Sequence, residues 1–325
     1  MKRFLSALCL CLLLTGSSFA GQPDGKDYAV VNLSVCNMRD KPDFSAEMIT
    51  QAIMGMPLRV LDHQDWYQIQ TPDDYKGWVH RDGIYRMTLD EVRAWNRAEK
   101  VVVTEVYAFV YEAADAKSQT VCDVVAGDRM KYVGKKGKFF EVELPDGRRG
   151  YLLRKEGAIL SQWRKTLKTD VSSILATAKR LMGVPYLWAG TSTKGMDCSG
   201  FVRTVLYQHD MIIPRDTGPQ SRSGQRIDIA SDYGNLQPGD LIFFGRKATV
   251  DQKERVSHVG IYMGNKRFIH SLGSVKTGSF DPAAVDYDEY NLGRLLFAAR
   301  VLPYINKEEG LNTTDRNLYY SENFE

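Results

Sequence analysis

Two stretches in the second half of the chain place apolar residues at the spacing of a helix that buries one face. The first follows Asp170 and stops before Gly183, with apolar positions at Val171, Ile174, Leu175, Ala178 and Leu181. The second follows Asp197, with apolar positions at Phe201, Val202, Val205 and Leu206. Aspartate is a favoured N-cap, and this spacing is typical of an amphipathic helix. We therefore predict helices that begin near residues 171 and 198.

A pair of strand patterns follows the second predicted helix. Residues 257–264 (Ser-His-Val-Gly-Ile-Tyr-Met-Gly) and 268–271 (Phe-Ile-His-Ser) are separated by the turn signal Gly-Asn-Lys-Arg. Two such runs joined by a short turn predict a hairpin. Side chains alternate between the faces of a strand, so an odd-numbered connection would place His258 and His270 on the same face.

The first half of the chain contains an internal repeat of short alternating strands. One copy includes residues 66–69 and 72–79, and the other includes residues 139–142 and 145–152, at an offset of 73 residues. Gly, Pro and Asp turns join the strands, which predicts two small all-β barrels.

A helix signal lies between the two copies of the repeat. Residues 88–91 (Thr-Leu-Asp-Glu) form a capping box, which predicts a helix that continues to about Ala98. Val92 and Trp95 lie three residues apart and could pack on one face of this helix. It could equally be an ordinary surface helix.

Cys198 would occupy the first turn of the second predicted helix. The unpaired N–H groups and the positive end of the helix dipole stabilise a thiolate there. Such a position, with a histidine nearby, can lower a thiol pKa from about 8.5 to roughly 3.5–7.5. A buried structural cysteine is the alternative. His258 could face Cys198 while His270 orients His258, and this pair therefore favours a catalytic Cys-His-His triad.

These motifs resemble the NlpC family of bacterial cell-wall cysteine peptidases, which have a papain-like fold. Besides the two histidine segments, the matching segments fall in the family's order: residues 185–190 (Pro-Tyr-Leu-Trp-Ala-Gly), 197–201 (Asp-Cys-Ser-Gly-Phe), 214–217 (Pro-Arg-Asp-Thr) with Gln220, and 236–241 (Leu-Gln-Pro-Gly-Asp-Leu). The repeats resemble bacterial SH3-like domains, most clearly at Gly77-Trp78. The resemblance implies an α+β papain-like catalytic domain preceded by two small all-β SH3-like barrels.

The resemblance also implies roles for individual residues. His258 would take the thiol proton and later protonate the leaving amine, and His270 would hold the His258 ring. The backbone N–H of Cys198 and the hydroxyl of Tyr186 would form the oxyanion hole. A packed loop aromatic is the alternative for Tyr186.

The substrate class that the resemblance implies is peptidoglycan stem peptides, cut between γ-D-glutamate and the following diamino acid. The domain combination looks closest to YkfC-type enzymes, which require a free L-Ala amine. By the motif match, Asp197, Ser199, Asp216 and Thr217 would line the substrate side. A carboxylate cluster can select a free ammonium, because an uncharged amide analogue cannot form the charged hydrogen bond.

Glu47 and Tyr75 of the first SH3-like domain are the candidates for closing the site around the amine. The alternatives are a solvated strand-edge charge for Glu47 and an exposed turn aromatic for Tyr75. Asp216 could equally cap the segment that follows it.

The first twenty residues resemble a secretory signal peptide. Lys2 and Arg3 precede an apolar run from Phe4 to Leu14, which is too short to span a membrane, and Ser-Phe-Ala ends at Ala20. We expect cleavage after Ala20 and export to the periplasm or the extracellular space.

Three cysteines remain in the expected mature chain: Cys36, Cys122 and Cys198. The odd number predicts at least one free thiol. Cys36 and Cys122 could pair, but we favour two buried thiols because the residues fall in different predicted domains.

Charge and ligand patterns narrow the function further. The formal net charge is +3 and basic residues are scattered, so neither nucleic acid nor an anionic membrane is an expected partner. No other long apolar run follows the signal segment. The chain has no C-x-x-C or H-x-x-x-H motif, so we expect neither zinc nor another cofactor. His63, His80 and His209 have no motif context and are expected at the surface.

The predicted organisation is a signal peptide at residues 1–20, SH3-like domains at 21–87 and 101–162, and a connector helix at 88–100. The NlpC-type domain would cover 163–305, followed by a tail at 306–325 that is disordered or lies across the other domains. Two other functions stay open: an autolysin that cuts intact peptidoglycan, and a non-catalytic wall-binding protein. The retained nucleophile and base favour an enzyme. The sequence leaves open whether the third stem residue is diaminopimelate or lysine.

Overall fold

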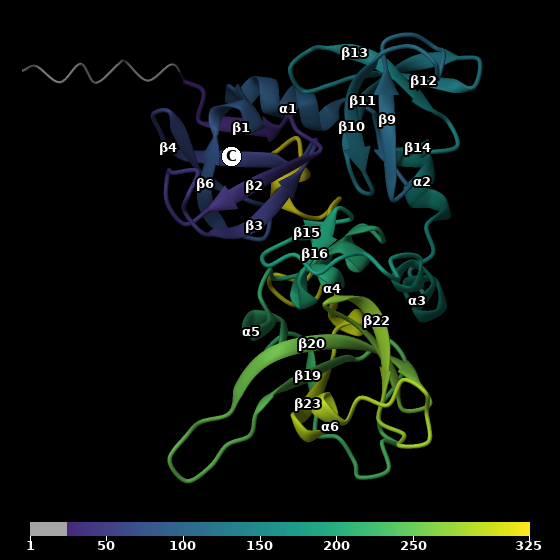
Figure 1. The fold of residues 1–325 in the computed structure, drawn as a ribbon. Helices are drawn as coiled ribbons and strands as arrows, with labels where there is room; N and C mark the ends of the chain where they lie inside the picture. Colours follow the sequence, from purple (N-terminus) through teal and green to yellow (C-terminus); the bar gives the residue numbers. More distant parts are fainter. Residues whose placement is uncertain (1–24) are drawn as a thin grey trace, which may run out of the picture.

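The computed structural model describes residues 25–325, so the predicted signal peptide lies outside the described residues. In Figure 1 two all-β units lie side by side at the top, and a mixed α and β unit lies below them. No helix among residues 25–325 is long and apolar enough to cross a membrane.

The first all-β unit is an antiparallel sheet of seven strands in the order β3-β2-β6-β5-β4-β1-β7. Alternate side chains point inward along β2 and β6, so that Met38 and Val79 are buried with Leu58 and Ile69. The strands are β1 (Tyr28–Val31), β2 (Val35–Arg39), β3 (Met48–Ile53), β4 (Pro57–His63), β5 (Trp66–Gln70), β6 (Lys76–His80) and β7 (Ile84–Met87), with a short 3₁₀ turn η1 (Arg81–Gly83) before β7.

The second all-β unit repeats this topology strand for strand, in the order β10-β9-β13-β12-β11-β8-β14. Its strands are β8 (Lys100–Val103), β9 (Tyr107–Tyr111), β10 (Thr120–Val125), β11 (Arg129–Lys136), β12 (Phe139–Glu143), β13 (Arg149–Leu153) and β14 (Gly157–Ile159). The two predicted SH3-like barrels are therefore confirmed. A Cβ at Gly77 would come within 2.9 Å of Ile49, and one at Gly150 within 2.4 Å of Val110. Close packing thus explains why each copy carries a glycine at this place.

The predicted connector helix is α1 (Leu89–Arg97), and its capping box is present. Glu91 N–H donates to Thr88 Oγ1 at 3.3 Å, and Thr88 N–H donates to the Glu91 carboxylate at 2.7 Å. Val92 and Trp95 are both buried against the first barrel and the end of the chain. The helix therefore has a buried face and is more than a surface connection.

The C-terminal unit is built on an antiparallel sheet of six strands in the order β18-β23-β19-β20-β21-β22. Helices α3 (Val171–Arg180) and α4 (Cys198–Tyr207) begin where the sequence predicts, and their apolar side chains share a core with the sheet. A second cluster, which includes Phe244, Phe268 and Phe280, forms another part of the core of this unit. The strands are β18 (Gln225–Ile227), β19 (Leu241–Arg246), β20 (Arg255–Gly264), β21 (Arg267–Leu272), β22 (Ser274–Ser279) and β23 (Leu295–Arg300).

Short elements complete this unit and join it to the barrels. They are α2 (Leu160–Thr166), β15 (Thr191–Ser192), β16 (Gly195–Met196), β17 (Met211–Ile212), α5 (Thr217–Gln220), α6 (Glu289–Gly293), η2 (Leu302–Tyr304), β24 (Asn312–Thr313) and η3 (Leu318–Tyr320).

The C-terminal tail returns to the first barrel, as the yellow segment in Figure 1 shows. Asn317 Nδ2 donates to the Pro72 carbonyl at 2.8 Å, and Phe324 is buried with its ring 5.2 Å from that of Tyr28. Of the two alternatives for the tail, the structure shows the one in which it lies across another domain.

Buried ion pairs fix the units relative to each other. Arg203 on α4 contacts Asp73 of the first barrel at 2.8 Å, and Arg129 of the second barrel contacts Asp210 at 2.8 Å. Arg164 on α2 contacts the same Asp210 carboxylate at 2.8 Å. Since a buried charge without its partner is costly, these pairs specify one arrangement of the units.

Two predictions about isolated residues have different outcomes. Cys36 and Cys122 are free thiols, as favoured, but only Cys36 is fully buried and Cys122 is half-buried; burial raises the pKa of each to about 12. The expectation that His209 lies at the surface is wrong. His209 is buried, with Nδ1 2.8 Å from the Lys168 carbonyl and Nε2 2.9 Å from Thr177 Oγ1. Both ring nitrogens have protein partners there, so the side chain can leave water.

Candidate active site

Cys198 is the first residue of α4 and is 8% exposed. Asp197 caps the helix by accepting the Gly200 N–H at 2.7 Å. A Cβ on residue 200 would come within 1.9 Å of the Gly190 carbonyl oxygen, so only glycine fits at this position of the Asp-Cys-Ser-Gly motif. The motif therefore joins the loop before the helix tightly to its first turn.

Asp197 and Ser199 also belong to a buried polar network around Arg215. The guanidinium contacts Asp197 Oδ2 at 2.7 Å, Ser199 Oγ at 2.9 Å and Thr50 Oγ1 of the first barrel at 2.9 Å. This network consumes much of the hydrogen-bonding capacity of Asp197 and Ser199. Both residues line the site, but the contacts of Asp197 chiefly fix the start of α4 and the Arg215 side chain.

His258 and His270 lie on the neighbouring strands β20 and β21 with their rings facing each other. His258 Nε2 is 2.8 Å from His270 Nδ1, and both side chains are buried. Gly260, between them on β20, leaves room for this contact, because a Cβ there would come within 3.2 Å of the His270 Cβ. The hairpin thus aligns the two imidazoles as the sequence predicts.

Helix α4 packs on the sheet, so that Cys198 shares a core with Val259, the residue after His258. The Cys198 sulfur lies 3.6 Å from Thr217 Oγ1, at the start of α5. The structure therefore brings Cys198, the His258 strand and Thr217 to one place.

Burial controls the protonation of these groups. Burial and the neighbouring Asp197 carboxylate raise the pKa of the Cys198 thiol, although Thr217 and the backbone N–H groups of Val259 and Ser199 act in the opposite direction. Burial lowers the pKa of His258 to about 3 and that of His270 to about 4. The expected lowering of the thiol pKa is therefore wrong for the resting site. At neutral pH it holds a neutral thiol and neutral imidazoles.

A cavity of about 350 Å³ opens over Cys198, and two units form its walls. The first barrel contributes Glu47, Met48, Ile49 and Tyr75. The C-terminal unit contributes Tyr186, Trp188, Ala189, Asp197, Cys198, Ser199, Arg215, Asp216, Thr217, Gly218, Arg255, Val256 and Ser257. The predicted oxyanion and substrate residues therefore all line one cavity.

The residues expected to surround an amine are tied to the catalytic unit. Glu47 Oε1 accepts a hydrogen bond from Trp188 Nε1 at 3.0 Å, and Tyr75 lies beside Asp216. Burial, followed by the Asp216 charge, raises the pKa of Tyr75 to about 12. Asp216 makes no side-chain cap on α5, so capping does not explain its position, and its side chain is half exposed.

Tyr186 lines the same cavity on the loop before Cys198. Its backbone N–H donates to the Gly273 carbonyl at 2.9 Å, which ties this loop to the turn between β21 and β22. Burial and the nearby Cys198 raise the pKa of Tyr186 to about 12. Its hydroxyl is therefore protonated at neutral pH and can donate a hydrogen bond.

Trp188 and Arg255 are lining residues that sequence reasoning did not assign. Trp188 lies within residues 185–190, a segment that resembles the NlpC family, so the sequence pointed to this loop. Arg255 carried none, because only folding of β20 brings it to the cavity. Its side chain is exposed and forms no ion pair with the other described residues.

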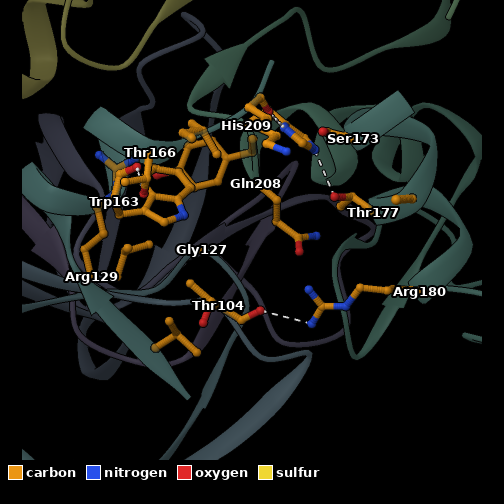
Figure 2. A pocket seen from close by; sticks show the side chains of 16 residues that line it. Thr104, Gly127, Arg129, Trp163, Thr166, Ser173, Thr177, Arg180, Gln208 and His209 are labelled. Atoms are coloured by element: carbon orange, nitrogen blue, oxygen red, sulfur yellow. Dashed lines mark hydrogen bonds between the residues drawn. The ribbon is translucent and has the colours of Figure 1, made fainter. Parts of the chain in front are cut away.

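A separate cavity of about 360 Å³ lies between the second barrel and helices α2 and α3. Figure 2 shows Trp163, Gln208, His209 and Arg180 around it. It contains none of the three triad residues. Among residues 25–325, no group of three or more His, Cys, Asp or Glu side chains is placed to hold a metal ion.

Comparison with known proteins gives matches to both kinds of domain. Residues 183–291 match the NlpC/P60 family, and residues 38–84 match the bacterial dipeptidyl-peptidase Sh3 domain. A γ-D-glutamyl-L-lysine dipeptidyl-peptidase from Bacillus cereus is 34% identical over 68% of this chain and 66% of its own length. The Bacillus subtilis protein of the same name is 26% identical over 68% of this chain and 71% of its own.

A solved structure extends the match to the whole fold. An NlpC/P60 family protein from Bacillus cereus superposes with a TM-score of 0.70 at 26% identity, over 85% of this chain and 100% of that one. The α+β catalytic fold and the SH3-like domain before it are thus both found in known proteins. From its motifs, its site and these matches, the chain belongs to the NlpC/P60 family of cysteine peptidases.

Proposed function

We propose that the protein hydrolyses the bond between γ-D-glutamate and the following diamino acid in peptidoglycan stem peptides, and that it requires a free N-terminal L-alanine. The observation that carries this proposal is the composition of the cavity over Cys198. It joins the nucleophile to carboxylates from two units, Glu47 and Asp216, within about 350 Å³. A cavity of this size suits a small peptide. The names of the Bacillus relatives support the same bond.

The chemistry begins from a neutral pair. His258 takes the proton of the Cys198 thiol as the sulfur attacks the amide carbonyl, and the backbone N–H of Cys198 and the Tyr186 hydroxyl stabilise the oxyanion. His258 then gives the proton to the leaving amine. Water, activated by the same imidazole, hydrolyses the thioester and restores the thiol.

Charge supports selection of a free amine. The cavity contains the Arg215 guanidinium, but Asp197 and Ser199 already occupy it. Asp216 lies 3.8 Å from the Arg215 guanidinium, but its side chain is half exposed, so its carboxylate and that of Glu47 can accept an alaninium group, with the Tyr75 hydroxyl as a further partner. A hydrogen bond to a charged group is worth about 1.5–3 kcal/mol, or roughly 10–100-fold in affinity.

Arg255 supplies a cation for the acidic part of the substrate. It is exposed at the cavity wall and forms no ion pair within residues 25–325, so it can receive a carboxylate of the stem peptide.

The test compares L-Ala-γ-D-Glu-diaminopimelate with its N-acetylated form. We expect kcat/KM to be at least about tenfold higher for the free amine. Glu47→Gln should reduce this preference, since glutamine can still accept the Trp188 hydrogen bond but carries no charge. Glu112→Gln, an exposed change on the second barrel, is the matched control and should leave the preference unchanged.

Equal cleavage of both peptides, together with activity on intact sacculi, would instead identify a wall hydrolase. Binding of sacculi without any cleavage would identify a wall-binding protein.

We also propose that the protein is exported, on the basis of the sequence of residues 1–20. Mass spectrometry of the protein made in its host should then show a mature chain that begins at Gly21. An intact Met1 would contradict export by this route.

A further inference from the structure

The second ring nitrogen of His270 has no hydrogen-bond partner among the described residues. His270 Nδ1 faces His258, but Nε2 is buried without a partner, and the side chain is 0% exposed. A buried polar group without a partner destabilises the fold, so such a group calls for an explanation.

One carboxylate faces this nitrogen. Asp288 Oδ2 lies 3.9 Å from His270 Nε2, and the Asp288 side chain is itself largely buried. The distance is longer than a hydrogen bond but within the range of a charge interaction. Catalytic contacts are often long in the unliganded enzyme and shorten when the substrate is bound.

Asp288 is held firmly in this position. It caps α6, with Oδ1 accepting the Asn291 N–H at 3.0 Å and Oδ2 accepting Asn291 Nδ2 at 2.6 Å. Its own N–H donates to the Ser279 carbonyl on β22 at 2.9 Å. Helix α6 and strand β22 therefore fix the carboxylate beside the histidine pair.

We propose that Asp288 is a positioning residue whose carboxylate accepts a hydrogen bond from the Nε2–H of His270 and so sets the tautomers of both histidines. This inference rests on the proposed peptidase function and extends its site. With its proton on Nε2, His270 can use Nδ1 only as an acceptor, and it must then receive the Nε2–H of His258. His258 Nδ1 is left without a proton, and it is the atom that takes the proton of Cys198.

The same carboxylate stabilises the charged state that forms during the reaction. When His258 takes the thiol proton, positive charge develops on the histidine pair. Burial lowers the pKa of His270, and the Asp288 charge raises it. Lys276, the cross-strand neighbour of His270, lowers this pKa further. Lys276 and Arg294 also lower the pKa of His258. Asp288 is thus the group that compensates two nearby cations.

Asp288→Asn separates this role from helix capping. Asparagine caps helices about as well as aspartate, so α6 should remain intact. With its oxygen on the Asn291 N–H, the amide would turn its NH₂ toward His270, which disfavours a proton on Nε2. We expect kcat to fall by about 10–100-fold with little change in KM, by analogy with the loss of outer partners of metal-bound histidines.

The direct readout is the tautomer. In protein with ¹⁵N-labelled histidine, the wild type should show His270 protonated on Nε2, and Asp288→Asn should shift the proton to Nδ1 or give a mixture. Asp288→Ser, which also keeps a cap, provides a second uncharged variant. Asp170→Asn, the same change at the N-cap of α3, is the matched control and should alter neither kcat nor the tautomer.

Wild-type kcat and an unchanged His270 tautomer in folded Asp288→Asn and Asp288→Ser would overturn the role of Asp288. That result would leave the peptidase proposal intact, because the wild-type protein would still cleave the peptide. Absence of cleavage by the wild-type protein would count against the proposed function, and the tautomer measurement would still decide the role of Asp288.

Discussion

Burial favours the neutral forms of the three proposed catalytic residues. Cys198, His258 and His270 all have pKa values shifted toward the neutral form, and burial is the largest cause for each. Burial of the site therefore favours the neutral thiol over the thiolate. In the proposed mechanism the thiolate forms only with substrate bound, when His258 takes the thiol proton as the sulfur attacks the amide carbonyl.

This protonation state predicts the acid side of the pH profile. The pKa of His258 is lowered to about 3, so the base stays unprotonated as the pH falls. We expect kcat/KM to change less than about threefold between pH 7 and pH 5.5. A histidine with its ordinary pKa of about 6.5 would lose roughly tenfold over this interval. An acid limb centred near pH 6.5 would contradict the assignment.

Arg255 gives a second prediction for a single residue. Arg255→Gln removes the cation at the cavity wall, so KM for the tripeptide should rise by about 5–50-fold with a smaller effect on kcat. The control is Arg246→Gln, because Arg246 is exposed and pairs with Arg255 across β19 and β20. An unchanged KM would mean that the substrate carboxylates bind elsewhere.

The elements that carry the site were largely predictable, because their signals are local. The caps at Asp170 and Asp197 set the starts of α3 and α4, and the turn at residues 264–267 set the hairpin that pairs His258 with His270. The internal repeat in the first half of the chain predicted both barrels. A cap or a turn is read from neighbouring residues, so no tertiary information was needed.

Features that depend on packing between distant segments were not predictable. The burial of His209, the use of Asp197 to hold Arg215, and the contact of Asp288 with His270 all join residues that lie far apart in the chain. The direction of the Cys198 pKa shift also depends on how completely the fold covers the sulfur. These contacts have no signature in local sequence patterns.

The β20–β21 hairpin makes a prediction at the scale of the element. Gly260→Ala should push against His270, because the added Cβ would lie 3.2 Å from the His270 Cβ and 3.1 Å from the Ile269 carbonyl oxygen. We expect kcat to fall at least about tenfold, since small misplacements of catalytic groups are costly.

The control for this substitution is Gly134→Ala on β11, where the added Cβ meets nothing closer than 3.8 Å. Kinetics and circular dichroism of both variants provide the measurement. Full activity of a folded Gly260→Ala protein would show that the hairpin tolerates displacement of His270.

The whole molecule brings the first barrel and the catalytic unit together with side-chain contacts that leave little freedom. Thr191 N–H donates to Gln51 Oε1 at 2.9 Å, Arg215 Nε donates to Thr50 Oγ1 at 2.9 Å, and Arg203 pairs with Asp73. Gln51 and Thr50 lie on β3, which begins directly after Glu47. The same strand thus anchors the barrel and supplies the wall of the cavity.

Asp73→Asn should therefore weaken the whole assembly. Both partners of the Arg203 pair are largely buried, and removing one charge from such a pair typically costs about 3–5 kcal/mol. We expect a lower urea midpoint and a higher KM, because the cavity wall loses an anchor.

Asp228→Asn breaks an exposed pair with Arg226 and should change stability by less than about 1 kcal/mol. If both substitutions had equally small effects in urea, the barrel would not depend on this contact.

The proposed function requires that Cys198 cleaves a stem peptide after γ-D-glutamate. The most direct measurement is mass spectrometry of the products that the purified protein forms from L-Ala-γ-D-Glu-diaminopimelate, with Cys198→Ala beside it. We expect L-Ala-γ-D-Glu and free diaminopimelate from the wild type and no products from the variant. Cleavage at another bond, or products that persist in Cys198→Ala, would contradict it.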